Sequence, residues 1–165
     1  MDNTDKTAIK RNKPSAPLLY LLKKKMIKGK VLDYGCGYGV DAEKIGADKF
    51  DPNFWNHRPT RKYNQILCFY VLNVVDSGVN KIRIIRDMWK LLRTNGKIFF
   101  ALRNDIDVLG YDKGWEEYGN GWITKKGTYQ EEISFENLQM LVRRSKTEMT
   151  VEQVSVNIYT AKKWQ

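Results

Sequence analysis

The chain has 165 residues, of which 42% are hydrophobic and 29% charged, and its formal net charge is +10. This length suits a single domain over residues 1–165, and the absence of any apolar run of about 18 residues argues against a membrane span. The N-terminus lacks the apolar core of a signal peptide, so we expect a cytoplasmic protein. The two cysteines have no metal-ligand spacing, and we expect no bound metal.

Positive charge is concentrated near the N-terminus. Residues 1–30 hold nine of the 29 Lys and Arg but only two of the 19 acids, whereas the rest of the chain is nearly balanced. We expect residues 1–14 to form a flexible basic arm that ends at the prolines Pro14 and Pro17. Such a segment attracts polyanions, and nucleic acid is the common one. A solvated surface that aids solubility explains the same charges equally well.

The predicted elements of the first half alternate between helix and strand. Apolar residues at helical spacing predict an amphipathic helix over 17–27. A short buried strand follows over 30–34, and then come a glycine loop and a short helix. The next strand, 48–50, leads into a polar loop over 51–64.

The second half continues the alternation and ends differently. The predicted elements are a buried strand over 66–71, a helix over 79–93, a strand over 97–102, a helix from its N-cap Ser134 to Arg144, and antiparallel strands within 150–160. Residues 103–133 are rich in Trp, Tyr and Gly, and we expect them to be irregular. The pattern predicts an α/β fold with a Rossmann-like, doubly wound, mostly parallel sheet and antiparallel C-terminal strands.

The glycine loop is the most specific motif, within residues 31–41, Val-Leu-Asp-Tyr-Gly-Cys-Gly-Tyr-Gly-Val-Asp. Gly35, Gly37 and Gly39 let the backbone turn at the end of a strand and let a ligand lie against bare main chain. A dinucleotide site needs G-x-G-x-x-G, whereas the glycines here stand at alternate positions. Asp33 would repel a diphosphate and suits a cationic or neutral ligand. The alternative is a glycine-rich turn in another α/β protein.

This motif resembles the first motif of class I S-adenosylmethionine-dependent methyltransferases. The resemblance implies a methyl-transferring enzyme whose cofactor carries an ammonium group, a sulfonium and a ribose diol, but no phosphate. It also implies a seven-stranded sheet, and the short stretch between Asp51 and the next strand predicts a trimmed version with the third strand reduced or lost. The cofactor-binding residues that we expect are Asp33, Gly35, Cys36, Gly37, Gly39, Asp51, Phe69 and Tyr70.

A narrower resemblance covers residues about 8–104. This part looks like the methyltransferase domain associated with DNA phosphorothioation and like small methyltransferase-like proteins of phages. The matching pieces are Ser15-Ala16-Pro17, the glycine motif, Asp51-Pro52, Tyr70-Val71-Leu72-Asn73-Val74-Val75, Trp89 and Leu91-Leu92, with Gly127-Thr128-Tyr129-Gln130 further on. The resemblance implies a link to DNA metabolism. It gives no methylated atom, because the Asp-Pro-Pro-Tyr motif and the Pro-Cys nucleophile of known base methyltransferases are absent.

Three positions carry alternative interpretations. Asp51 follows the second strand, where a carboxylate accepts hydrogen bonds from a ribose diol, but turns also favour Asp before Pro52. Asn73 and Tyr70 follow the buried strand at the place where methyl donor and acceptor meet, and they are the catalytic candidates. Asn73 is equally well explained as a residue that caps the strand end. His57, the only histidine, lies in a polar loop and is expected to be solvated.

Residues 104–133 are the expected substrate cover, because they follow a strand whose carboxyl end faces the cleft. Aromatic side chains alternate there with lysines, a pattern that allows base stacking and phosphate contact. A lid that packs on its own aromatic side chains is the alternative. The substrate-binding candidates are Arg103, Trp115, Trp122, Tyr129 and Gln130.

Together these features predict an S-adenosylmethionine-dependent methyltransferase that acts on nucleic acid, with DNA favoured. Nucleic acid is also the partner that we expect for the basic N-terminal region. One alternative is a small-molecule methyltransferase with a closed pocket under the cover. Another is a non-catalytic, cofactor-binding accessory protein of a phage or DNA-defence system. The sequence leaves the acceptor and the oligomeric state open.

Overall fold

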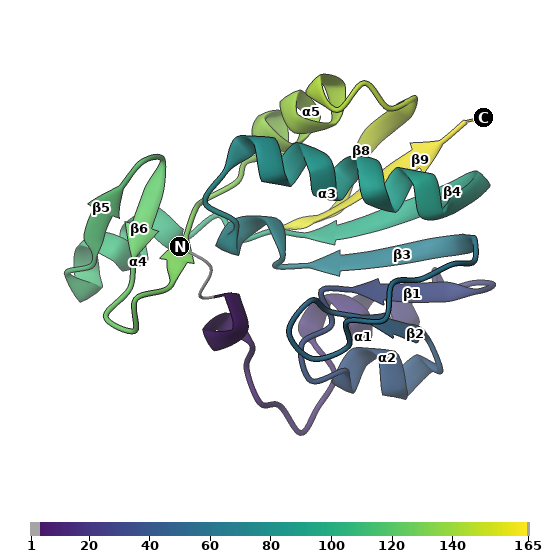
Figure 1. Cartoon of the computed structure of the whole chain (residues 1–165), viewed down its shortest axis with the longest axis horizontal. Coiled ribbons are helices and arrows are strands. Elements are labelled where there is room, and N and C mark those ends of the chain that lie inside the picture. The colour runs from purple at the N-terminus through teal and green to yellow at the C-terminus, as the bar shows by residue number, and fades with distance from the viewer. Residues whose placement is uncertain (1–3, 165) are drawn as a thin grey trace.

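A six-stranded sheet forms the centre of the protein in the computed structural model, which describes residues 4–164 (Figure 1). Four neighbouring strands pair with one another in parallel, and the two remaining pairings in the sheet are antiparallel, which confirms the predicted fold class. In their order across the sheet the strands are β2 (Asp48–Phe50), β1 (Val31–Tyr34), β3 (Tyr63–Phe69), β4 (Leu92–Ala101), β9 (Ile158–Lys163) and β8 (Met149–Ser155).

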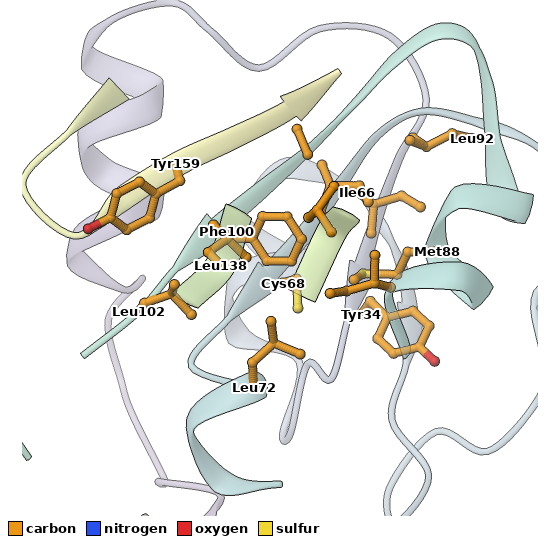
Figure 2. Close-up of a cluster of buried hydrophobic side chains, with 14 of the residues drawn as sticks. Tyr34, Ile66, Cys68, Leu72, Met88, Leu92, Phe100, Leu102, Leu138 and Tyr159 are labelled. Atoms are coloured by element: carbon orange, nitrogen blue, oxygen red, sulfur yellow. The ribbon is translucent and has the colours of Figure 1, made fainter. Parts of the chain in front are cut away.

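The two faces of the sheet are covered by different helices. The helices are α1 (Ala16–Lys23), α2 (Val40–Ile45), α3 (Gly78–Leu91) and α5 (Phe135–Arg144). Along β3, Ile66 and Cys68 join the cluster that contains the inner faces of α3 and α5, whereas Leu67 joins the cluster under α1. This alternation with period two is what a sheet buried on both faces requires, and Figure 2 shows the larger cluster.

Local signals set the helix ends. Ser134 caps α5, because its hydroxyl accepts a hydrogen bond from the Asn137 N–H (3.2 Å), and this prediction is confirmed. The first helix is shorter than predicted. It ends at Lys23, and Lys25 adopts a left-handed conformation with φ of +54°. A left-handed residue cannot continue a right-handed helix, so the apolar spacing beyond it does not extend α1.

The β2 edge of the sheet is trimmed, as predicted. β2 has a single neighbour, and the chain then runs as a loop from Asp51 to the start of β3 at Tyr63. An isolated bridge between Asp51 and Trp55 folds this loop back on itself. The expected polar loop over 51–64 is therefore slightly shorter than predicted, because β3 begins at Tyr63.

The prediction that residues 103–133 are irregular is wrong. They contain a helix and a separate three-stranded antiparallel sheet, which lie beyond the carboxyl ends of the parallel strands (Figure 1). The elements are α4 (Ile106–Lys113), β5 (Glu116–Tyr118), β6 (Gly121–Ile123) and β7 (Tyr129–Gln130). Strands of two or three residues are too short for an alternating pattern to be visible in the sequence.

Two short 3-10 helices complete the chain, η1 (Thr4–Thr7) and η2 (Leu72–Val74). In Figure 1 η1, in dark purple, lies between the small sheet and the main body. Over residues 4–164, none of the helices combines the length and the apolar character that a membrane crossing needs.

Candidate active site

The glycine motif forms a loop between β1 and α2 at the carboxyl edge of the parallel strands. Gly35 has φ of +76°, and a Cβ added there would come within 2.4 Å of Val71 Cγ2. Only glycine meets both conditions without strain. Gly37 is fixed on both sides, because its N–H donates to Asp51 Oδ2 (2.9 Å) and its carbonyl accepts from Trp55 Nε1 (3.0 Å). The loop therefore presents a fixed stretch of bare main chain.

Three buried carboxyl groups surround this loop: Asp33 on β1, Asp41 on α2 and Asp51 at the end of β2. Asp33 is only 4% exposed, and its burial, reinforced by the nearby Asp41, raises its pKa to about 7. Arg11 acts in the opposite direction and favours the ionised carboxylate. A cation bound at the loop would favour the same ionised form, so the charges suit a positively charged ligand.

Asp51 is held by three backbone N–H groups. Its Oδ2 accepts from Gly37, and its Oδ1 accepts from Asn53 (2.9 Å) and Phe54 (3.3 Å). The turn interpretation of Asp51 therefore describes a real contact. It does not exclude the ribose interpretation, because two carboxylate oxygens have about four acceptor positions and three are in use.

Phe69 and Tyr70 end β3 beside the loop. Tyr70 follows the strand with φ of +61°, a backbone conformation that residues other than glycine rarely adopt. Its N–H donates to the Ala101 carbonyl (2.8 Å). Burial raises the pKa of the Tyr70 phenol, and Arg103 and Arg11 act against this shift. The phenol is therefore neutral near pH 7, with a hydrogen to donate and an oxygen that accepts.

The N-terminal cover segment, which we define as residues 8–15, packs over the glycine loop. Ser15 donates to Asp41 twice, from its N–H (2.7 Å) and from its hydroxyl (2.5 Å). Arg11 lies 3.5 Å from the same carboxylate, and Ala8 Cβ lies 3.4 Å from the place where a Gly37 Cβ would stand. The flexible arm that we predicted over residues 1–14 is thus packed on the body in its second half. Residues 1–3 lie outside the described residues.

A pocket of about 540 Å³ opens between this segment and the end of β3. Its lining consists of Lys10, Arg11, Asn12, Lys13, Pro14, Ser15, Ala16 and Tyr70. From the strand end where we expect methyl donor and acceptor to meet, the lining includes Tyr70. Tyr70 is the one catalytic candidate that reaches the pocket.

Asn73 has a different position. Its side chain is fully buried in η2 and forms hydrogen bonds only with backbone groups. Its amide nitrogen donates to the carbonyls of Glu131 (2.8 Å) and Arg103 (3.3 Å), and its oxygen accepts from the Arg103 N–H (3.2 Å). Asn73 therefore joins the start of the cover to its end, and we do not retain it as a catalytic candidate.

The substrate candidates of the cover fall into two groups. Trp122 and Tyr129 are buried, and each donates to a carboxylate of the cover, Asp107 (2.8 Å) and Glu131 (2.9 Å) respectively. Their rings pack inside the cover. These two residues therefore fit the alternative interpretation, in which the cover is a lid that packs on its own aromatic side chains. Gln130 is half-buried and pairs with Trp122 in the small sheet.

Trp115 and Arg103 are the more accessible candidates. The ammonium group of Lys113 lies 5.7 Å from the centre of the half-buried Trp115 ring. Arg103 pairs with Asp105 (2.8 Å) directly after β4 and lies close enough to Tyr70 to affect its pKa. Of the five candidates, Arg103 is the one that lies close to Tyr70, a residue of the pocket lining.

Several residues of the site were not found from the sequence. Lys81 and Glu131 form a largely buried ion pair that fixes the end of the cover to α3. The Ser15–Asp41 contact pins the N-terminal cover segment. The partners are separated by 50 and 26 residues, so no local pattern reports either contact.

The side chains of Cys36, Cys68 and His57 take no part in the site. Burial raises the pKa of the Cys36 thiol to about 12, and Cys68 is also buried with a raised pKa, so neither thiol is a nucleophile near pH 7. His57 is exposed in the loop after β2. Cys36 is part of the glycine loop, and its backbone N–H donates to the Phe50 carbonyl (3.2 Å). Within residues 4–164, no group of His, Cys, Asp and Glu side chains is arranged to hold a metal ion.

Comparison with known proteins gives three findings. The model of a family described as a methyltransferase domain matches residues 7–153. A search of curated proteins gave no match. Solved structures that resemble this chain include several methyltransferases, each at low sequence identity.

Three of these structures illustrate the likeness. A Thermotoga maritima S-adenosylmethionine-dependent methyltransferase, described as a possible histamine N-methyltransferase, is 14% identical with a TM-score of 0.59 and covers 88% of this chain and 87% of its own. The N-methyltransferase NodS of Bradyrhizobium japonicum, in complex with S-adenosylhomocysteine, is 13% identical with a TM-score of 0.57 over 90% and 85%. The 1,6-didemethyltoxoflavin N1-methyltransferase of Burkholderia thailandensis is 16% identical with a TM-score of 0.58 over 91% and 78%.

Proposed function

We propose that the chain methylates an acceptor held in the pocket beside Tyr70. The chain belongs to the methyltransferase-domain family and is an S-adenosylmethionine-dependent methyltransferase. When bound, S-adenosylmethionine supplies an activated methyl group on a sulfonium. The observation that carries the proposal is the position of this pocket, between the N-terminal cover segment, which packs over the glycine loop, and Tyr70 at the end of β3. The residues around it provide the binding and positioning that methyl transfer needs.

The glycine-loop side fits the cofactor chemically. The cofactor has a cationic ammonium group and a sulfonium, and this side of the site carries buried carboxyl groups. Asp33 is the residue that we assign to the ammonium group, and Arg11 offers the opposite charge for the carboxylate at the same end of the molecule. Asp51 keeps acceptor capacity for the ribose hydroxyls, and the bare main chain at Gly35, Gly37 and neighbouring Cys36 allows close approach.

Tyr70 is the residue that we assign to the acceptor. Its phenol is neutral, so it donates a hydrogen bond to the acceptor or accepts one from it. The strained backbone that places it is typical of residues held in position by their surroundings. Displacement of a methyl group depends mainly on alignment of the reacting atoms, so no separate general base is assigned.

Nucleic acid, with DNA favoured, stays our proposed acceptor class, and the lysines of the pocket lining support it. The narrower likeness to DNA phosphorothioation-associated and phage methyltransferase-like proteins remains a prediction from sequence motifs. A small molecule is the second candidate, because the Burkholderia thailandensis neighbour is named for such an acceptor. A cofactor-binding accessory protein without activity is the third.

One experiment separates the three candidates. The protein is incubated with methyl-labelled S-adenosylmethionine and, in parallel, with pooled DNA, pooled RNA and small metabolites from a cell extract. Label in DNA or RNA supports the nucleic-acid proposal, and label in the metabolite fraction replaces it with the small-molecule candidate. Binding of labelled cofactor without any transfer would overturn the catalytic proposal in favour of an accessory role.

A further inference from the structure

The wall of the pocket that the N-terminal cover segment forms carries positive charge. Lys10, Arg11 and Lys13 line the pocket, and none of its lining residues is acidic. From this wall we propose that the methyl acceptor carries an anionic group, a phosphate or a carboxylate, that binds to Lys10 and Lys13. This inference rests on the proposed function, because it assumes that the pocket receives the acceptor.

Charge is segregated across the site. The buried carboxyl groups, Asp33, Asp41 and Asp51, surround the glycine loop, where a cationic cofactor is stabilised. Lys10 and Lys13 are exposed on the N-terminal cover segment, which packs over this loop. A ligand with a single kind of charge would suit only the buried carboxyl groups or only the exposed lysines. Two ligands of opposite charge suit both, since complementary potentials favour correct placement.

The three cations of the wall are not equivalent. Arg11 is directed toward the carboxylates, because it lies 3.5 Å from Asp41 and favours the ionised form of Asp33. Lys10 is exposed, and its ammonium group lies 5.7 Å from the centre of the Tyr38 ring. Lys13 is exposed too, and no carboxylate pairs with it among residues 4–164. The two lysines are therefore the charges available to an acceptor.

Two further features make this side positive. Ala16, in the pocket lining, is the first residue of α1, and the N-terminal end of a helix carries a partial positive charge. Arg103 also lies close enough to Tyr70 to act on its phenol. An anion bound at the lysines would thus lie beside Tyr70, the residue that we assign to the acceptor.

The test uses inorganic phosphate as the probe and the full chain saturated with S-adenosylhomocysteine. Amide NMR shifts are followed at constant ionic strength in the wild type, in the double variant K10Q/K13Q and in the matched control R93Q/K146Q. The control removes two exposed positive charges that lie outside the pocket and the cover, so the change in net charge is identical. We expect shifts at residues 10–16 and Tyr70, with affinity reduced about tenfold or more in K10Q/K13Q, as for loss of a charge-assisted hydrogen bond, and unchanged in the control.

Shifts elsewhere than residues 10–16 and Tyr70, or equal weakening in both double variants, would overturn the inference, because phosphate would then respond only to net charge. Unchanged binding of S-adenosylhomocysteine in K10Q/K13Q shows that this variant is folded. Failure of the wild type to bind S-adenosylhomocysteine would refute the proposed function instead. A parallel titration with a short single-stranded DNA identifies the source of the anion. Tighter binding than phosphate at the same amides indicates nucleic acid, and equal or weaker binding indicates a small anionic molecule.

Discussion

The glycine-loop side and the acceptor side of the candidate site are built in different ways. The glycine-loop side uses backbone groups and buried carboxylates, such as Gly37 hydrogen-bonded to Asp51 and Trp55. The acceptor side, to which we assign the pocket lining and the cover over residues 104–133, uses exposed side chains of the N-terminal cover segment and a separate small sheet. The difference suggests that the cofactor is recognised by a rigid frame, whereas the acceptor is recognised by charges that are easily exchanged. Substitutions should therefore affect the two sides unequally.

The largest expected effect comes from a side chain at Gly35. Gly35→Val adds a Cβ within 2.4 Å of Val71 Cγ2 at φ of +76°, so backbone strain and overpacking add up. We expect a loss of about 2–5 kcal/mol in the free energy of unfolding. Gly119→Val on the acceptor side shares the left-handed backbone, with φ of +59°, but meets no atom within 4 Å. Gly119→Val should lower the free energy of unfolding by about 1–2 kcal/mol. Urea unfolding that shows equal losses in the two variants would contradict a rigid glycine loop.

A smaller effect is expected for Asp51→Ala. Loss of the carboxylate should weaken S-adenosylhomocysteine binding by about 1–3 kcal/mol, because ribose hydroxyls would lose a charged partner. Calorimetry with the analogue that lacks the ribose 2′-hydroxyl separates this role from the turn. If Asp51 binds the diol, removal of the hydroxyl weakens binding in the wild type but not further in Asp51→Ala. Equal losses in both proteins would leave Asp51 as a turn residue.

Asp33 should make cofactor binding depend on pH. Burial and Asp41 raise its pKa to about 7, so the free protein holds a proton there below that pH, and a cationic ligand must displace it. Affinity for S-adenosylhomocysteine should rise by about tenfold from pH 6 to pH 8. The slope should vanish in Asp33→Asn. On the acceptor side, Asp105→Asn should leave the pH dependence of S-adenosylhomocysteine affinity unchanged. The hydrogen bond from Arg103 lowers the pKa of Asp105, so this carboxyl group stays ionised from pH 6 to pH 8.

The same shift has a consequence for the free protein. A carboxyl group whose pKa is raised on folding contributes stability that is fully present below its unfolded pKa, the ordinary value of 3.8, and is lost as the pH rises through about 7. Relative to Asp33→Asn, the free energy of unfolding of the wild type should therefore fall between pH 4 and pH 7. Equal pH profiles of wild type and variant in urea unfolding would contradict the assignment of the shift to Asp33.

The smallest effect is expected from the basic end of α1. Lys23, Lys24, Lys25 and Lys28 are exposed, whereas the pocket lies at the other end of the helix, at Ser15 and Ala16. If DNA is bound, changing these four lysines to Gln should flatten the salt dependence of its affinity by up to about one unit for each phosphate that is no longer neutralised. Binding of S-adenosylhomocysteine should not change. A salt slope identical to that of the wild type would remove α1 from the proposed nucleic-acid surface.

The sequence predicted the frame better than the acceptor side, for a physical reason. Buried strands, the glycine loop and the cap at Ser134 are set by neighbours in the chain, so their patterns are local and readable. The packing of the N-terminal cover segment depends on Ser15 and Asp41, and the cover is fixed by Lys81 and Glu131. These pairs are distant in sequence, and no periodicity reports them.

Asn73 and Trp122 illustrate the same limit. Both have the residue type expected of a substrate site, an amide at a strand end and an aromatic ring in a cover. In the structure Asn73 bonds backbone carbonyls and Trp122 donates to Asp107, so both are used to assemble the cover. Residue type predicts which chemistry is available, and only the three-dimensional contacts decide whether it is already in use.

The most direct test of cofactor recognition by the bare glycine loop is a calorimetric titration of S-adenosylhomocysteine into three proteins. Wild type and Gly46→Val should bind alike, because Gly46 shares a left-handed backbone, with φ of +65°, but has no atom within 4 Å and lies at the far end of α2. Gly37→Val, folded by circular dichroism, should give no binding heat, because a side chain at φ of +53° strains the loop to which we assign the cofactor and stands against Ala8 of the N-terminal cover segment. Undiminished binding by a folded Gly37→Val, or no binding by the wild type, would contradict cofactor recognition at this loop.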